Sequence, residues 1–195
     1  MRLRNGIDIP DIGFGTWNIP YGEDCEKAVF EAIKAGYRHI DTAGAYGNER
    51  SVGLGVKAAL REGLIDLYLI HWPANKVRYK NPDEVNAVAW QALEELYTEG
   101  RVKAIGVSNF LPHHIEELKK SAKVLPMVNQ IELHVGYMQE DVVEYNNNNG
   151  IITEGYSPLG TGALLENEIL REMAKKYQTT VSNICISFLR QREII

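Results

Sequence analysis

Residues able to handle a proton follow an apolar stretch near position 40 of the chain. His39-Ile40-Asp41 predicts a buried strand that ends on a carboxylate, and Tyr46 follows on the next loop. In parallel α/β folds the loops after the carboxyl ends of strands carry the chemistry, so Asp41 and Tyr46 are in the right kind of place to act. A structural interpretation stays open beside this one, in which Asp41 is a solvated strand end and Asn48 is the N-cap of the next helix.

Polar side chains also end most of the other strands that the pattern predicts. In chain order they are Thr16, Asp41, His71, Asn109, Gln130 and Tyr156. Such residues surround one mouth when parallel strands close into a barrel, because every strand then presents its carboxyl end on the same side. The sequence therefore predicts a site made of single residues from successive strands.

The elements that must position these residues alternate regularly between strand and helix. Strands are expected at residues 12–17, 38–42, 65–72, 102–107, 127–133 and 151–156, and helices at 25–33, 49–62, 81–99, 112–120 and 139–146, with a further helical part at the C-terminal end. Gly36 and Gly63 are expected to end the first two helices. The Asn5-Gly6 pair predicts an N-terminal β-hairpin over residues 2–9, and the polar run 146–149 predicts a frayed helix end.

This alternation argues for right-handed βαβ units and a parallel sheet, so the fold class is α/β. An open nucleotide-binding sheet usually carries a glycine-rich turn between its first strand and a helix. Here Gly13-Phe14-Gly15 lies inside the first strand instead. That position favours the parallel (β/α)8 TIM-barrel type, here incomplete, with about six βα units after the hairpin.

Composition narrows the class of partner and the number of domains. A chain of 195 residues, 45% of them hydrophobic, is expected to form a single domain over residues 1–195. A net charge of −5 gives no electrostatic footprint for nucleic acid or an anionic membrane, and no apolar run approaches about 18 residues. Cys25 and Cys185 each fall on the apolar stripe of an expected helix, which predicts two small core residues and not a disulfide framework. A cytoplasmic protein is the resulting expectation.

Six segments of the chain resemble motifs of the aldo-keto reductase family, in the family's order, nearest to bacterial members that resemble diketogluconate reductases. They are residues 13–17, 39–49, 69–73, 105–110, 128–134 and 156–160. The resemblance implies a barrel that reduces small-molecule aldehydes and ketones to alcohols. It also implies hydride transfer from NADPH, with NADH as an alternative donor, and no Rossmann fingerprint.

The resemblance implies a role for each matching residue. Tyr46 matches the general acid that protonates the carbonyl oxygen, Asp41 the aspartate beside it, and His71 the histidine that orients the carbonyl. The cofactor-binding positions of the family match Thr16, Asp41, Ser108, Asn109, Gln130, Tyr156, Ser157, Leu159 and Thr161. Trp17 and Trp72 match apolar walls of the substrate pocket, to which Tyr46 and His71 also contribute.

The chain departs from the family pattern at the catalytic lysine. That lysine ends a third strand between the tyrosine and the histidine, whereas the only lysine in this interval is Lys57, inside an expected helix. One strand and one helix are therefore expected to be missing between Leu64 and Ile65. The chain also stops at Ile195, before the family's eighth strand and its basic loop for the 2′-phosphate of NADP. Unpaired strand edges then predict self-association.

Three functional hypotheses follow. The first is an aldo-keto reductase in shortened form, whose activity depends on how far the missing lysine matters. The second is a non-catalytic relic or nicotinamide-cofactor-binding module. The third treats a set of acidic and imidazole side chains as ligands of a barrel metallohydrolase, because His-x-Asp at a strand end can bind a divalent ion. That set is His39, Asp41, His71, Glu132 and His134.

Overall fold

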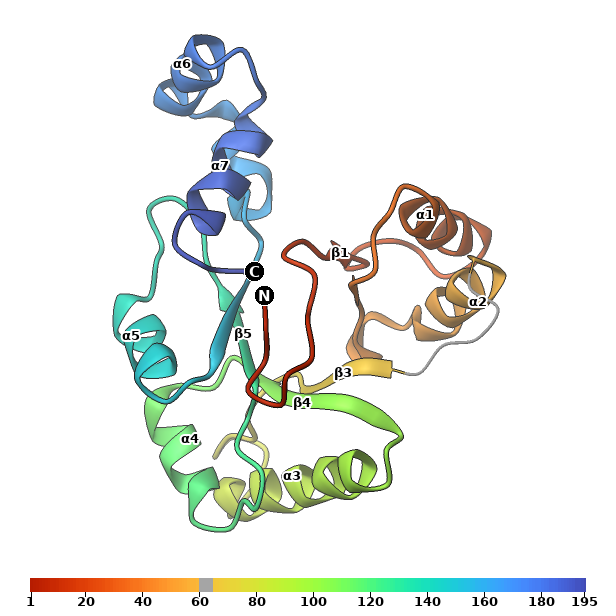
Figure 1. The fold of residues 1–195 in the computed structure, drawn as a ribbon, viewed down its shortest axis with the longest axis vertical. Helices are drawn as coiled ribbons and strands as arrows, with labels where there is room; N and C mark the ends of the chain where they lie inside the picture. Colours follow the sequence, from red (N-terminus) through yellow and green to blue (C-terminus); the bar gives the residue numbers. More distant parts are fainter. Residues whose placement is uncertain (60–64) are drawn as a thin grey trace. The chain divides into compact units, whose positions relative to one another are not determined.

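The computed structural model describes residues 1–59 and 65–195 of the chain (Figure 1). Two compact units are present in it. Unit 1 contains Met1–Arg2 and Asp8–Ile65, and unit 2 contains Leu3–Ile7 and Asp66–Ile195. The expectation of one domain over the whole chain stays a prediction beside this division.

Unit 1 is a pair of short parallel strands with two helices packed on each other. Strand β1 (Phe14–Gly15) pairs with β2 (Ile40–Asp41), and the helices are α1 (Glu23–Lys34) and α2 (Glu49–Ala59). Figure 1 shows α1 lying beside α2, and at Gly55 the packing leaves no room for a side chain, since a Cβ atom would lie 2.6 Å from the Glu26 carbonyl oxygen. The core of the unit is Cys25, Val29, Ile33 and Val52.

One of the two helix terminators expected in unit 1 can be compared with the structure. Gly36 follows α1 with a left-handed backbone (φ 109°), which confirms it as the terminator of the first helix. The second terminator, Gly63, and the junction expected after Leu64 lie outside the described residues. Strand β1 is shorter than the predicted 12–17.

Unit 2 is built on a four-stranded sheet in the order β3-β4-β5-β6. The strands are β3 (Ile65–Ile70), β4 (Val102–Ser108), β5 (Val128–Glu132) and β6 (Ile152–Tyr156). Pairing is parallel between β4 and β5 and between β5 and β6. The helices are α3 (Pro82–Thr98), α4 (Pro112–Lys119), α5 (Glu140–Asn148), α6 (Glu168–Lys176) and α7 (Val181–Arg190). Figure 1 shows α3, α4 and α5 flanking the sheet.

Two apolar clusters hold the helices of unit 2 to its sheet. One joins Trp90 of α3 to Ile105 and Phe110 at β4 and Ile115 of α4. The other joins β5 to α5 and α7 through Ile131, Leu133, Val142, Leu189 and Ile194. The final residue extends the sheet, because the Ile195 N–H donates to the Thr153 carbonyl (3.2 Å) and the Gly155 N–H donates to the Ile195 carbonyl (2.7 Å).

The N-terminal hairpin is confirmed in reduced form. An isolated antiparallel bridge joins Arg2 to Asp8, and the Gly6 N–H donates to the Leu3 carbonyl at 2.9 Å. Gly6 takes the left-handed conformation (φ 84°) that the Asn-Gly turn requires.

The expectation of a frayed end at residues 146–149 is wrong. Helix α5 runs to Asn148, and Asn146 is fully buried, with its amide donating to Thr153 Oγ1 at 3.1 Å. Arg4 Nη2 donates to the carbonyls of Asn149 and Gly150, which closes the helix end with a guanidinium. Two of these amides have structural partners, because Asn146 bonds to Asn129 and Thr153, and Asn149 bonds to Lys119 and the Tyr145 carbonyl.

No helix in the described ranges 1–59 and 65–195 is long and apolar enough to cross a membrane.

Candidate functional site

In unit 1, Thr16 at the end of β1 hydrogen-bonds to Asp41 at the end of β2 through its backbone N–H and its hydroxyl. Both the N–H and Oγ1 of Thr16 donate to the Asp41 carbonyl, at 3.0 and 2.9 Å. Thr16 is fully buried, so this pairing is shielded from water. The carboxyl ends of β1 and β2 are thereby held in register at the place where Asp41 emerges, half-buried.

Asn48 is a structural residue of this site whose full role the sequence did not reveal. It is fully buried, and its Nδ2 donates to the carbonyls of Thr16 and Ile19, both at 2.9 Å. Its Oδ1 accepts the Thr42 hydroxyl at 3.3 Å, and its backbone carbonyl accepts the Val52 N–H in the first turn of α2. Asn48 therefore stands at the start of α2, as expected, while its side chain fixes the loop after β1.

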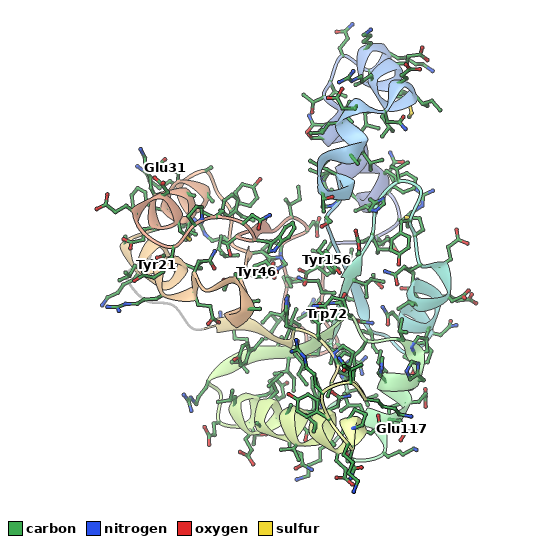
Figure 2. The ribbon with its side chains drawn as sticks, turned by 180° about the vertical axis from the view of Figure 1, so that it is seen from behind. Tyr21, Glu31, Tyr46, Trp72, Glu117 and Tyr156 are labelled. Carbon is green, nitrogen blue, oxygen red and sulfur yellow. The ribbon has the colours of Figure 1, made fainter. Side chains whose placement is uncertain are left out.

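Tyr46 lies on a single turn of 3-10 helix between β2 and α2. This turn spans Gly44–Tyr46, and the Tyr46 N–H donates to the Ala43 carbonyl at 2.9 Å. Its side chain is half-buried and is labelled in Figure 2. Trp17, after β1, is 55% exposed. The elements of unit 1 thus carry four of the predicted site residues, Thr16, Trp17, Asp41 and Tyr46.

In unit 2 the strand ends carry a connected hydrogen-bond network centred on Asn109. Its Nδ2 donates to the His71 carbonyl and to Ser108 Oγ, both at 3.0 Å. Its Oδ1 accepts the Tyr156 hydroxyl at 3.0 Å, and Ser108 Oγ donates to the Gln130 carbonyl at 3.0 Å. Five predicted residues from four separate segments of the sequence are therefore joined by hydrogen bonds. They are His71, Ser108, Asn109, Gln130 and Tyr156.

Glu154 extends this network and was not among the predicted residues. Gln130 Nε2 donates to Glu154 Oε1 at 2.6 Å across the β5–β6 pair, in which the two residues are direct register partners. Both side chains are buried. A signal existed in the sequence, because Glu154 precedes Tyr156 by two residues and strand alternation places both on one face.

Tyr156 is held as a neutral phenol. Burial raises the pKa of its hydroxyl above the ordinary value, and the nearby charge of Glu132 and the neighbouring Tyr137 raise it further. The hydroxyl therefore stays protonated and continues to donate to Asn109 near neutral pH. Its ring is half-buried, as expected of an aromatic face that borders a site.

A cavity of about 740 Å³ opens at this end of the unit 2 sheet. Asn109 and Tyr156 line it together with Trp72, which is 60% exposed. Figure 2 labels Trp72 and Tyr156. Other walls come from the loop after Trp72, the start of α3, α4, the end of β5 and the segment after it, including Lys76, Asp83, His113, His114, Glu117, Glu132, Tyr137 and Gln139. The cavity combines aromatic, amide, imidazole and charged groups.

The last predicted cofactor residues lie on the loop after β6. Ser157 and Thr161 both take left-handed backbones, with φ of 52° and 53°, and the Gly160 N–H donates to the Ser157 carbonyl at 2.9 Å. Leu159 lies between them and is half-buried, whereas Thr161 is exposed. They are not among the residues that line the cavity with Tyr156.

Two further predictions concern residues outside the network. Lys57 is exposed on α2, which confirms its interpretation as a solvated helix face. Cys25 and Cys185 are both fully buried, as expected of core residues.

Among the residues that the structure describes, no three acidic, imidazole or thiol side chains are arranged to hold a metal ion, so the metallohydrolase hypothesis gains no support.

Polar residues at the carboxyl ends of parallel strands define an α/β enzyme of the TIM-barrel type, and comparisons with known proteins identify the family. The family model described as "Aldo/keto reductase family" matches residues 59–194. The chain belongs to the aldo/keto reductase family, which makes it an oxidoreductase by class. The resemblance stated from its motifs is confirmed.

Three relatives show how far the likeness extends. Glyoxal reductase of Bacillus subtilis is 37% identical over all of this chain and 80% of its own length. Methylglyoxal reductase DkgA of Salmonella typhimurium is 35% identical over 95% of the chain and 77% of its own length. The crystal structure of an aldo/keto reductase from Brucella melitensis superposes with a TM-score of 0.90 and 35% identity, over 100% of this chain and 85% of the other.

The alignments also measure the internal shortening. The match to the Bacillus subtilis protein spans 228 positions, whereas the chain has 195 residues, so at least 33 residues of that relative have no counterpart inside the aligned span. A strand with its following helix accounts for a segment of this size. This length agrees with the expectation that one βα unit is missing.

Proposed function

We propose that this chain is a shortened aldo-keto reductase that binds a nicotinamide cofactor, NADPH or NADH, and reduces small aldehydes or ketones slowly in the cytoplasm. The observation that carries the proposal is the Asn109 network, in which residues from four strand ends are joined by hydrogen bonds beside a cavity. The reductase names of the relatives support a small carbonyl substrate.

The residues present fit a nicotinamide ring that carries a carboxamide. Tyr156 offers an aromatic face for the ring, and Asn109 Oδ1, which accepts one hydrogen bond from Tyr156, offers its second lone pair to the carboxamide N–H, on the same cavity. Ser108 is fully buried and Gln130 is 4% exposed, so their contribution is to hold Asn109 in place. When bound, the cofactor supplies the hydride; Thr16, Ser157, Leu159 and Thr161 are proposed to hold its remaining parts.

The chain's own residues then handle the proton and the substrate. Tyr46 is the proposed general acid for the carbonyl oxygen, with Asp41 as its neighbour, and His71 is proposed to orient the carbonyl. Trp17 and Trp72 are exposed enough to form apolar walls for a substrate.

The missing segment limits this chemistry. An ordinary tyrosine has a pKa near 10 and donates a proton poorly near neutral pH unless a positive neighbour assists it. In the family that neighbour is the lysine of the third strand, and Lys57 lies on an exposed helix face instead. We therefore propose slow turnover. The same observation favours the second candidate, a cofactor-binding module without turnover.

Cofactor binding and NADPH consumption separate these candidates. Asn109→Ala is expected to weaken NADPH binding about tenfold, because the carboxamide loses its partner and Tyr156 loses its acceptor. Asn147→Ala, on an exposed position of α5, is the matched control. Quenching of tryptophan fluorescence reports binding, and NADPH absorbance with an activated aldehyde reports turnover.

The outcomes are distinct. Binding with slow, aldehyde-dependent NADPH oxidation that Tyr46→Phe abolishes supports the reductase. Binding with no aldehyde-dependent oxidation supports the binding module. Binding that Asn109→Ala leaves unchanged contradicts both, because the network would then have no part in holding the cofactor.

Self-association through the β3 edge of the sheet is a further proposal, which size-exclusion chromatography tests.

A further inference from the structure

The helix that follows Asn109 is capped by a histidine. Helix α4 begins at Pro112, and Leu111 before it is the N-cap residue, with an extended backbone (φ −81°, ψ 163°). Leucine offers no side-chain acceptor at an N-cap. Instead, the Leu111 N–H donates to Nδ1 of His114 at 3.1 Å, and the His114 N–H donates to the Leu111 carbonyl at 2.9 Å. His114 thus takes the part that glutamate or glutamine usually plays three residues after an N-cap.

This hydrogen bond fixes the protonation state of His114. Nδ1 accepts a hydrogen bond only through its lone pair, so the imidazole must be neutral with its proton on Nε2. A proton added at Nδ1 would turn the acceptor into a second donor facing the Leu111 N–H. Acid therefore breaks the cap directly.

The capped turn leads straight to the centre of the site. Asn109 precedes Leu111 by two residues and takes a left-handed backbone (φ 61°), a conformation that asparagine adopts more readily than most non-glycine residues. Phe110 between them is fully buried, and its ring meets the His114 ring edge-on at a centroid distance of 5.7 Å. Asn109 and His114 line the same cavity.

The charged and titratable groups around His114 come from α4, from α3 and from the other walls of the cavity. On α4 itself, the His113 ring lies 3.9 Å from it between centroids, and Glu117 follows one turn later. Asp83 faces it from the start of α3. The remaining cavity walls carry Lys76, Glu132, Tyr137 and Tyr156. Burial lowers the pKa of His114 below its ordinary 6.5, His113 lowers it further, and Asp83 acts in the opposite direction.

We propose that neutral His114 is a positioning residue that holds the Asn109 turn in its cofactor-binding form, and that protonation of His114 loosens this turn. The cofactor part rests on the proposed function. Because the pKa of His114 is lowered in the folded chain, the cap is fully present above about pH 6.5 and is lost as the pH falls through that lowered value.

Three variants isolate the histidine. His114→Gln keeps an acceptor for the Leu111 N–H that does not titrate, and His114→Leu removes the acceptor. His113→Gln removes the neighbouring imidazole and leaves the Leu111 partner in place. Binding of NADP⁺, the acid-stable oxidised form, is measured by tryptophan fluorescence as the pH is lowered. Titration of the ligand's own phosphate is common to all four proteins.

We expect acid to weaken NADP⁺ binding about fivefold more in the wild type and in His113→Gln than in His114→Gln, which corresponds to the loss of one neutral hydrogen bond. His114→Leu should bind about fivefold more weakly already at neutral pH. Equal acid weakening in the wild type and His114→Gln overturns the proposal.

Hydrogen exchange of the Leu111 amide tests the same device without any cofactor. Protection of this amide should fall with acid in the wild type and persist in His114→Gln. Equal protection in both proteins across the pH range overturns the titrating cap. If none of the four proteins binds NADP⁺ at neutral pH, the proposed function and the cofactor role of His114 are both wrong, and the amide alone reports on the cap.

Discussion

The predicted site residues are held in two different ways in the two units. In unit 2 the strands are five to seven residues long. Ser108 and Tyr156 end β4 and β6, Asn109 follows β4, and Gln130 lies in the middle of β5. Their side chains hydrogen-bond to one another. In unit 1 the strands are two residues long. The hydrogen bonds described there fix mainly backbone groups, since the buried side chain of Asn48 donates to two backbone carbonyls.

This difference separates binding from chemistry. The Asn109 side chain of unit 2 bonds to residues of the same unit, so we expect cofactor binding there to depend little on the missing segment. The proposed acid, Tyr46, stands on a single helical turn of unit 1, and we propose that it needs a positive neighbour from the missing third strand. Loss of that strand should therefore reduce turnover much more than cofactor affinity.

Restoring the missing segment is the largest test of this comparison. A version that carries the third strand and helix of a relative, at least 33 residues inserted after residue 64, regains the lysine. General acid catalysis contributes typically about 10²–10⁴-fold. We expect this version to reduce an activated aldehyde at least about a hundredfold faster than the present chain, as measured by NADPH oxidation.

The control is Tyr46→Phe in both backgrounds. In the restored version it should remove most of the gained rate, whereas cofactor affinity should change little in either protein. If the present chain already matches the restored version, and Tyr46→Phe abolishes both rates, the missing lysine has no catalytic importance and the proposed cause of slow turnover is wrong.

Removing Asn48 tests how unit 1 is held. Asn48→Ala leaves the buried carbonyls of Thr16 and Ile19 without their donor and is expected to cost about 2–4 kcal/mol of stability. Hydrogen exchange should show lost protection at the Val52 amide of unit 1, with the Gly155 amide of unit 2 as an internal reference. Asn147→Ala, at an exposed position, is the control. Unchanged protection at Val52 contradicts the assigned role of Asn48.

The sequence predicted the elements well because its helix stripes and strand runs are regular. All six strands and the first five helices lie within about two residues of their expected bounds as far as they are described, and Gly36 ends α1 with a left-handed backbone. The family resemblance then placed Ser108, Asn109, Gln130 and Tyr156, which the structure joins by hydrogen bonds. The hydrophobic pattern and the family motifs thus predicted where each element and each site residue lies along the chain.

Side-chain partners were harder to predict, because they depend on which residues the fold brings opposite one another. Glu154 pairs with Gln130 only because β5 and β6 are in parallel register. The asparagine run near α5 was misjudged because polarity alone does not distinguish a solvated amide from one that satisfies buried groups. Asn146 satisfies a buried group, because its amide donates to the Thr153 hydroxyl on β6.

The smallest expected effect concerns the outer surface of unit 2, where α4 and α5 are joined by a polar cluster. Lys119 Nζ donates to Glu116, to the Tyr145 hydroxyl and to Asn149, and the Tyr145 hydroxyl donates to Glu116. These hydrogen bonds, from Lys119 first and from Tyr145 second, lower the pKa of Glu116. The cluster ties the helix that carries His114 to its neighbour, but water screens it.

Tyr145→Phe should therefore lower the melting temperature by only about 2 °C near neutral pH, in keeping with the small worth of exposed ion pairs. The sign of the pH dependence follows from Glu116. A carboxyl whose pKa is lowered by folding stabilises the protein above its ordinary value of 4.5 and loses that contribution as the pH falls through the lowered value. The difference between wild type and Tyr145→Phe should shrink over that range, and NMR titration should show the Glu116 pKa rising in the variant. A Glu116 pKa that Tyr145→Phe leaves unchanged would mean that the hydrogen bond from Tyr145 does not lower it and that Lys119 accounts for the shift.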